Sequence, residues 1–427
     1  MINFWLENRD EFVYRYLSEK GYKNKIFMVI IESPEEITVS ERIRSKIFNL
    51  FKNYGSEVDL LFWFFDEKSI KVVFNGLAKN FHQRFEKIWK DISLLSENIS
   101  GEEFSFVRKP ILAIGKINTV KLFDLHYEEI EEIVELITED LKSNATEKII
   151  FVKDYTEQTD LLLNKARERI RLRKHVERAL KERDITLFVH YIFDLELKKK
   201  GAEILARIPK PDRSGYVSAG LFIPYLEREN LTGEFDKVVL STVRDNLENL
   251  KLVTDRIFVN IYPSSLSYAS AVEELIKLID GCNDIGIDLV LEITEYAIVT
   301  NKQILEYLQE KKFTIAFDDF GSGYTNFETV GELAKYKNAK VIKLDGKIVQ
   351  NMLNSEIYRS IVESVSLFAQ KIDMEIVYEF ISSEKIFNEI RKIAETYSFK
   401  PDKISLQGFL LHKPTPLEEE IKKVKTS

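Results

Sequence analysis

Two adjacent carboxylates stand out in the stretch "AFDDFGSGY", residues 316–324. Asp318 and Asp319 follow the apolar run "KKFTIA" and precede a bend that contains Gly321 and Gly323. Like charges this close together repel each other. Hard divalent cations such as Mg2+ and Mn2+ prefer oxygen ligands and offset that repulsion. The pair therefore indicates a site for one or two divalent ions, and the glycines would let the next loop fold tightly over it.

Similar polar residues end short apolar runs throughout the second half of the chain. The runs are "TLFVHYIFDL", "GAEILARI", "RIFVNIY", "LVLEITE", "FTIAFDD", "VIKLD", "EIVYEF" and "ISLQGFLL". The polar residues are Glu203, Asn260, Glu292, Asp318, Lys343, Glu379 and Gln407. From Asn260 onward they recur about every 30 residues, which is the length of one strand and helix in a (β/α)8 barrel. The interval before Asn260 is longer and predicts an extended loop and helix region.

Eight runs of this kind predict an α/β fold, a TIM-type (β/α)8 barrel over residues 186–427. We expect its strands to be parallel and buried on both faces, so that the polar residues meet at one end of the barrel, where active sites of this fold lie. Each charge could instead begin a loop and meet only water, but charges in step on seven strands favour a shared site. Two ions held there would suit an in-line phosphoryl displacement.

Composition narrows the class of protein. A chain of 427 residues with 44% hydrophobic and 31% charged residues is typical of a globular protein with two domains. Its apolar runs are too short to span a membrane and its N-terminus lacks a signal-peptide core, which predicts a cytoplasmic protein without membrane insertion. The single cysteine, Cys282, excludes an intramolecular disulfide and a cysteine-based zinc site. A net charge of −8 argues against binding a nucleic-acid polymer, but allows a small phosphorylated ligand held through metal ions.

A charged stretch separates the two halves. "NKARERIRLRKHVERALKERD" carries apolar residues at helical spacing and predicts an exposed connecting helix over residues 164–185. Its basic bias could instead mark a nucleic-acid patch. The predicted organisation is thus a first domain at 1–163, this linker, and the barrel at 186–427.

The motifs of the second half resemble, in order, those of EAL-domain cyclic-di-GMP phosphodiesterases. "AEILAR" is similar to the EAL signature, with Ile204 in its middle position. "FVNIYPSSL", "LEITE", "FDDFGSGY", "VIKLD", "VYEF" and "QGFLLHKP" are similar to the motifs that follow. The resemblance covers residues 186–418 and implies metal-dependent hydrolysis of cyclic di-GMP, a bacterial second messenger, to linear pGpG.

The resemblance also implies roles for single residues. One metal ion would be held by Glu203, Asn260, Glu292 and Asp318, and a second by Asp318 and Asp319. Glu379 would complete the second site or act as general base, and Lys343 would orient the attacking water. Gln407 would support the site and the substrate. Arg207 would contact a phosphate, unless it only covers the rim, and Glu295 would steady the loop of Gly321 and Gly323, unless it is a surface residue.

Two departures from the family pattern bear on activity. Where the family typically reads "AEGVE", this chain reads "YEFIS", so that Phe380 replaces a glycine and Ser382 a glutamate. Where the family reads "QPIVDL", this chain places His190 and Tyr191 at the positions of a ligand-contacting glutamine and a proline. A phenylalanine lacks the backbone freedom of glycine. These changes leave open a catalytically inactive cyclic-di-GMP receptor or protein-interaction module.

The first 163 residues more weakly resemble a degenerate GGDEF domain. "KIFMVIIES" and "LAIGKI" predict strands, "VSERIRSKIFNLFKNYG" a helix, and "VDLLFWFFDEKSIKVVF" a hairpin. "FFDEK" occupies the signature position, with Phe64 and Phe65 in place of glycines that would approach a nucleotide. Asp66 and Glu67 fit turn residues as well as catalytic relics. The resemblance implies a regulatory domain without cyclase activity, and a homodimer formed through the EAL-like domain.

Overall fold

The computed structural model describes residues 26–32, 59–65, 69–75, 111–117, 125–144, 150–294, 310–321 and 337–426. The chain divides into two compact units, residues 1–172 and 173–427. The division falls inside helix α7 (Thr159–Glu182), which overlaps the predicted connecting helix. In the described part of the chain, no helix has the length and apolar character needed to cross a bilayer.

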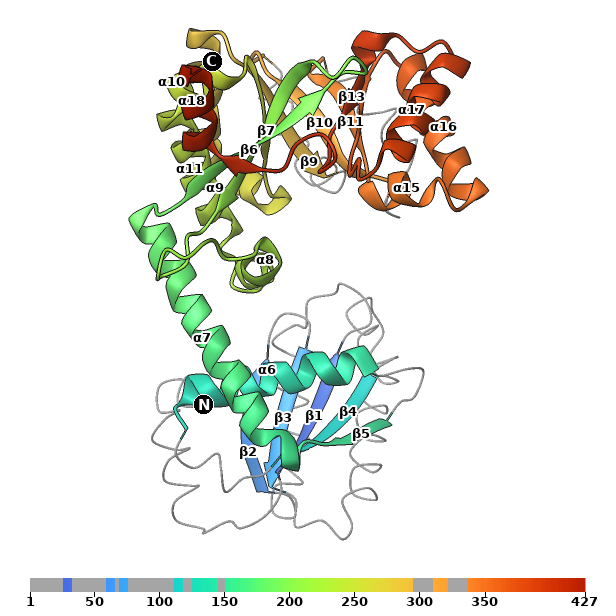
Figure 1. Cartoon of the computed structure of the whole chain (residues 1–427). Helices are drawn as coiled ribbons and strands as arrows, with labels where there is room; N and C mark the ends of the chain where they lie inside the picture. The colour runs from blue at the N-terminus through green and yellow to red at the C-terminus, as the bar shows by residue number, and fades with distance from the viewer. Residues whose placement is uncertain are drawn as a thin grey trace. The chain divides into compact units, whose positions relative to one another are not determined.

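The first unit contains a five-stranded sheet in the order β2-β3-β1-β4-β5 (Figure 1). Its strands are β1 (Ile26–Glu32), β2 (Asp59–Phe65), β3 (Ser69–Asn75), β4 (Ile111–Ile117) and β5 (Ile150–Asp154). β2 and β3 form the predicted antiparallel hairpin, and Phe64 and Phe65 end β2. Helix α6 (Tyr127–Asn144) precedes β5, and Arg167 of α7 forms an ion pair with Glu129 of α6 at 2.6 Å. The predicted helix of this half and the turn residues Asp66 and Glu67 lie outside the described residues.

The second unit is a closed eight-stranded barrel (Figure 1). Its strands are β6 (Thr186–Phe193), β7 (Lys199–Arg207), β8 (Arg256–Asn260), β9 (Asp288–Thr294), β10 (Thr314–Phe320), β11 (Ala339–Leu344), β12 (Glu375–Tyr378) and β13 (Ile404–Leu406). They follow one another around the barrel in chain order, and a β13–β6 pairing closes it. All eight predicted runs therefore form strands.

The expectation that every strand is parallel was wrong for β6, which runs antiparallel to β7 and β13. The reason is the short connection from β6 to β7. A parallel pair needs a crossover of a dozen or more residues, whereas a tight turn can only reverse the chain. Asp194 closes this turn, because its Oδ1 accepts hydrogen bonds from the backbone N–H groups of Glu196 and Lys198, each at 2.8 Å. Strands β7 to β13 are parallel.

Helices cover the outside of the barrel. The long interval before Asn260 contains α8 (Ala219–Arg228), α9 (Thr232–Asp245) and α10 (Leu247–Val253). The others are α11 (Ala269–Ile285), α15 (Gly346–Asn351), α16 (Glu356–Lys371), α17 (Glu384–Thr396) and α18 (Leu417–Thr426), and a short strand β14 (Thr415–Pro416) pairs with β6. α9, for example, buries Phe235, Val239 and Val243, which recur at helical spacing. Helices α11, α16 and α18 pack directly against strands β9, β12 and β6, respectively.

The barrel interior is filled by side chains. A fully buried layer consists of Ile192, Phe258, Val290, Ala316, Val341 and Val377. Each comes from a different strand, so the layer seals the middle of the barrel. Because side chains on one face of a strand recur every second residue, the next inward position on each parallel strand lies one layer nearer its carboxyl end.

Candidate active site

The predicted polar residues form the layer directly above this apolar layer. Asn260, Glu292, Asp318, Lys343 and Glu379 each lie two residues beyond one of its members. Glu203 joins them from β7 and Gln407 from the residue after β13. His190 joins from the antiparallel strand β6, where it is paired in register with Glu203. The strand period therefore brings all eight side chains to one end of the barrel.

Lys343 lies at the centre of the carboxylates. Its side chain is 1% exposed, and its Nζ lies 2.7 Å from Glu292 Oε1, 2.9 Å from Glu379 Oε1 and 3.1 Å from Asp318 Oδ1. Glu203 Oε1 is at 4.0 Å. Burial alone would lower the pKa of Lys343, but these carboxylates outweigh it and raise the pKa well above its usual range. Lys343 is therefore a permanent cation in the site.

One ammonium group does not balance the carboxylates around it. Burial raises the pKa of Glu292 well above its usual range and that of Glu379 to about 8, and the charge of Lys343 offsets these effects only in part. The pKa of Asp319 is also raised, first by burial and then by the charges of Asp318 and Asp345. Further positive charge would relieve this excess.

Glu203 differs from its neighbours because hydrogen bonds hold both of its oxygens. Asn260 Nδ2 donates to Oε1 at 2.7 Å, and Gln407 Nε2 donates to Oε2 at 2.8 Å. Burial acts to raise its pKa, but the charge of Lys343 and the hydrogen bonds from Gln407 and Asn260 lower it. Glu203 is thus an ionised carboxylate with a fixed orientation.

His190 fixes Gln407 in turn. Its Nε2–H donates to the carbonyl oxygen of His412 at 3.1 Å, and its Nδ1 accepts from Gln407 Nε2 at 3.0 Å. Burial lowers the pKa of His190, which agrees with the neutral ring that these two bonds require. The neighbouring Tyr191 is buried outside the barrel, where its hydroxyl donates to Glu420 of α18 at 2.8 Å. His190 therefore fixes the amide of Gln407, and Tyr191 holds α18 against the barrel.

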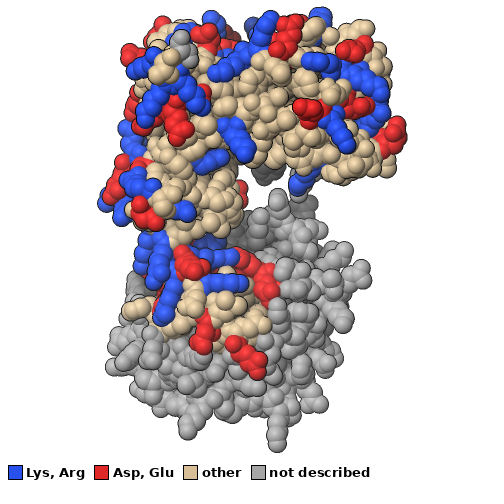
Figure 2. Space-filling model, in the orientation of Figure 1, with Lys and Arg blue, Asp and Glu red and all other residues tan. Residues whose placement is uncertain are grey.

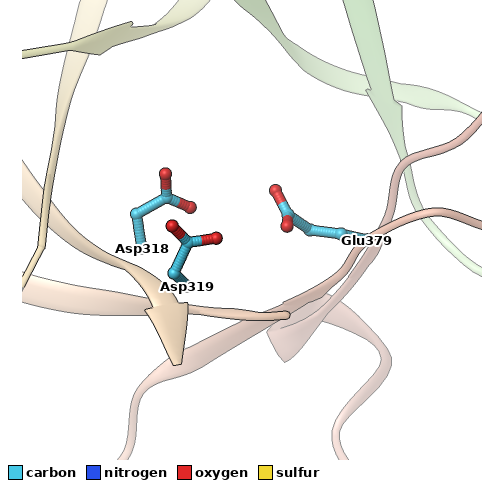
Figure 3. A group of neighbouring side chains, drawn as sticks. All are labelled: Asp318, Asp319 and Glu379. Atoms are coloured by element: carbon cyan, nitrogen blue, oxygen red, sulfur yellow. The ribbon is translucent and has the colours of Figure 1, made fainter. Parts of the chain in front are cut away.

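A bulge in β10 explains why two successive carboxylates face one place. The pairing of β10 with β11 is interrupted between Phe317 and Phe320, and Asp319 has a left-handed backbone with φ of +54°. Neighbouring side chains in a regular strand point to opposite faces, and a bulge removes that alternation. Oxygens of Asp318, Asp319 and Glu379 lie within 4.8 Å of one another, and Figure 3 shows the three side chains pointing toward a common space.

This group of side chains suits divalent cations. Oε2 of Glu292 is buried and has no hydrogen-bond partner among the described residues, while Oε1 of Glu292 and Oδ1 of Asp318 share the single ammonium group of Lys343. Buried carboxylate oxygens without donors are costly unless a cation meets them. The ligands on offer are carboxylates and one amide oxygen, the type that Mg2+ and Mn2+ prefer. The residues present therefore fit divalent ions.

The neighbours of the site show how its rim is built. The guanidinium of Arg207 lies 5.8 Å from the ring centre of Phe188 and donates to the carbonyl of Ala206 at 2.9 Å. Gly321 has a φ of +93°, and a Cβ there would come within 2.4 Å of Ile348. The bend after the Asp pair therefore requires glycine at 321. Gly323 and Glu295 lie outside the described residues.

The part of the chain that forms the barrel matches a known protein family. The family model described as the EAL domain matches residues 173–397, which is more than half of the chain. The chain belongs to the EAL domain family. The match includes every site residue named above except Gln407, and it contains the strands that carry them.

Curated relatives of this EAL protein cover the same region. The chain is 29% identical over 228 residues to cyclic di-GMP phosphodiesterase PdeF of Escherichia coli (strain K12), a match to 52% of this chain and 29% of PdeF. It is 30% identical over 253 residues to cyclic di-GMP phosphodiesterase PdeB of Shewanella oneidensis, across 57% of this chain and 28% of PdeB. The chain thus spans under a third of the length of these two relatives.

Among solved structures, the cGMP-bound form of the EAL enzyme Bd1971 matches over 94% of this EAL protein and 95% of that chain. The TM-score is 0.51 and the sequence identity is 16%. At this identity the likeness concerns the fold alone. It supports the TIM-type barrel of residues 173–427.

Asp236 is a buried acid that the motifs did not reveal. It lies on α9, and its Oδ2 accepts a hydrogen bond from the backbone N–H of Tyr262 at 2.7 Å. Burial raises its pKa to about 7, although the bond from Tyr262 acts to lower it. The contact holds the chain just after Asn260. Its signal in the sequence is an acid beside Phe235 and Val239 on the apolar face of a helix.

Proposed function

We propose that this EAL protein hydrolyses one phosphodiester bond of cyclic di-GMP to give linear pGpG, in the presence of divalent cations. The observation that carries the proposal is the buried group of carboxylates around Lys343 at the carboxyl ends of the parallel strands. That end of a (β/α)8 barrel is where active sites lie. The relatives PdeF and PdeB are both cyclic di-GMP phosphodiesterases, which supports cyclic di-GMP as the substrate.

The cations would be Mg2+ or Mn2+, and the site would hold two of them. Glu203, Asn260, Glu292 and Asp318 would hold one, and Asp318, Asp319 and Glu379 the other. Bound there, they would stabilise the charge that develops on the phosphoryl oxygens. The hydrogen bonds to Glu203 orient its carboxylate before any ligand arrives.

Other groups of the chain would bind and orient the reacting atoms. Lys343, buried among acceptors, would donate a hydrogen bond to the attacking water. Glu379 would accept the proton that this water loses. Arg207 would pair with a phosphate oxygen at the rim, where a guanidinium can donate two parallel hydrogen bonds. Gln407 would hold Glu203 and contact the substrate, with His190 fixing its amide.

The test is incubation of the full chain with cyclic di-GMP and Mg2+ or Mn2+, followed by chromatography of the nucleotides. We expect pGpG to appear, and to disappear when EDTA is added or in Glu203→Gln. Glu196→Gln is the matched control, because that side chain is 71% exposed in the turn before β7, at the opposite end of the barrel. Binding without turnover under every metal condition would favour the cyclic-di-GMP receptor instead, and absence of binding would contradict both functions.

Several finer assignments belong to the same proposal. The first unit is proposed as a degenerate GGDEF-like regulatory domain, supported by its antiparallel β2–β3 hairpin. In the same proposal the chain consists of a first domain at residues 1–163, a helical linker at 164–185 and the EAL domain at 186–427. Glu295 and Gly323 would steady the loop after Asp319. A cytoplasmic location, where an intracellular second messenger would be met, belongs to the proposal, as does the homodimer through the EAL domain that the family resemblance implies.

A further inference from the structure

Phe380 is an exposed aromatic residue held in an unfavourable backbone conformation. It follows Glu379 directly, its φ is +52°, and its side chain is 59% exposed. The left-handed region costs free energy for any residue with a bulky side chain. A phenyl ring that stays in water gains little from burial in return. Strained residues of this kind cluster at ligand sites, where the surrounding structure holds them in place.

The ring has a defined seat on the rim of the site. A Cβ placed on Gly346 would lie 2.0 Å from Cδ2 and 2.4 Å from Cγ of Phe380, so the ring rests directly on the glycine backbone. The residue before Gly346 is Asp345, whose backbone N–H donates to the carbonyl of Phe320 at 3.2 Å. Phe320 in turn follows Asp319. The ring therefore packs on the residue next to Asp345, which is hydrogen-bonded to the end of β10, and Phe380 directly follows Glu379 in the chain.

The chain beyond Phe380 is fixed as well. Ile381 N donates to the carbonyl of Gln407 at 2.9 Å, and Leu410 N donates to the carbonyl of Ile381 at 3.0 Å. A Cβ on Gly408 would come within 2.2 Å of Ile381 N, so these two loops are in close contact. Phe380 is thus held from both sides before a ligand binds, which lowers the entropy lost on binding.

We propose that Phe380 is a specificity-determining residue that stacks against one purine base of the substrate. The inference rests on the proposed function, since it concerns the base of a nucleotide whose phosphodiester lies at the carboxylates. Every nucleobase has a flat π-face, and a base stacked on an aromatic side chain gains free energy without any specific hydrogen bond. The exposed ring, next to Glu379, offers such a face at the rim.

The test compares Phe380→Leu, which keeps an apolar side chain on Gly346 but removes the ring, with Phe380→Trp, which enlarges it. We expect Phe380→Leu to raise KM for cyclic di-GMP about tenfold, equivalent to about 1.4 kcal/mol, a typical value for one stacked base. Its kcat should change much less than KM. Tyr358→Leu on α16 is the matched control, because it removes another partly exposed ring and should leave KM unchanged.

Phe380→Trp gives an optical readout of the same contact. The three tryptophans of the chain are Trp5, Trp63 and Trp89, so residues 173–427 contain none. Adding cyclic di-GMP should quench the fluorescence of Phe380→Trp beyond any change in the wild type, with KM kept near the wild-type value. Gly346→Ala gives an independent check, because its methyl group must displace the ring and should raise KM as Phe380→Leu does.

The outcomes separate the two proposals. If the wild type cleaves cyclic di-GMP while Phe380→Leu keeps its KM and Phe380→Trp shows no quenching, the stacking role is wrong and the proposed function stands. A fall in kcat at unchanged KM would likewise replace stacking with a role in positioning Glu379. If the wild type neither binds nor cleaves the nucleotide, the proposed function itself fails. Should Phe380→Leu not fold, the Trp and Gly346 variants decide the question.

Discussion

At the scale of single residues, the site is defined by how charge is distributed in a buried space. Lys343 contacts three carboxylates and lies near a fourth, whereas Glu203 is held by amide groups. Removing one partner of a buried ion pair leaves the other charges uncompensated, which costs about 3–5 kcal/mol. The same crowding makes the site depend on cations. Both effects can be measured apart from catalysis.

We expect Lys343→Met to lower the free energy of unfolding in EDTA by about 3 kcal/mol, because the carboxylates lose the buried ammonium group at their centre. Adding Mg2+ should recover part of that loss and should stabilise the variant more than the wild type, since an ion that binds only the native state stabilises it more the tighter it binds. Urea titrations with and without Mg2+ test this. Lys198→Met, which removes an exposed lysine, should change neither value; equal behaviour of the two variants would contradict the central role of Lys343.

Asp236 predicts a pH dependence of stability. Its pKa is 3.8 in the unfolded reference and about 7 in the fold, where burial raises it. Between these values the native state keeps a proton that the unfolded chain has lost, so stability falls as the pH rises, and the loss is complete above about pH 7. Asp236→Asn cannot ionise. We expect its stability relative to the wild type to rise between pH 5 and pH 8, on the order of 3 kcal/mol.

Urea unfolding of both proteins at several pH values measures that difference. Asp245→Asn on the same helix is the control, because Asp245 forms an exposed ion pair with Arg183 and its pKa is lowered by Arg183 and Arg244 against the effect of burial. The control should not gain stability over the wild type as the pH rises. A constant difference between Asp236→Asn and the wild type across the range would show that Asp236 is not a buried titrating acid.

At the scale of the strands, the pattern of apolar and polar residues predicts most of the barrel. Apolar runs and their polar ends located all eight strands and most of the site, because a side-chain period of two is set by the backbone. The expectation that β6 is parallel to its neighbours was wrong, because the connection between Phe193 and Lys199 is too short for a crossover. The partner of His190 could not be read from the chain, because Gln407 meets it only when the barrel closes.

The bulge in β10 gives a prediction at this scale. Asp319 has a φ of +54°, a region that asparagine tolerates and a β-branched residue does not. Asp319→Val should therefore be less stable than Asp319→Asn by about 1–2 kcal/mol. Both lack the carboxylate and should lose activity alike, so urea unfolding separates the backbone effect from the chemistry. Equal stability of the two variants would mean that the bulge relaxes at little cost.

At the scale of the whole molecule, the residues of the site belong to one unit. Glu203 to Gln407 all lie within residues 173–427, and the barrel closes on itself through β13 and β6. Basic and acidic side chains are interspersed over the described residues on the face drawn in Figure 2. The second part of α7 is bound to this unit, since His175 Nε2–H donates to the carbonyl of Pro209 at 2.6 Å and Tyr225 donates to Glu177 at 2.6 Å.

These contacts determine where the chain can be divided. A fragment that begins at Thr159 keeps the whole of α7 and every strand of the barrel, so we expect it to unfold cooperatively and to cleave cyclic di-GMP in a metal-dependent manner. Circular dichroism during urea unfolding and chromatography of the nucleotides test the two expectations. A fragment that begins at Thr186 loses the bonds of His175 and Glu177 and should be less stable. If the Thr159 fragment folds but is inactive while the full chain is active, the first unit is required for activity, and the expectation that the barrel is active on its own would be wrong.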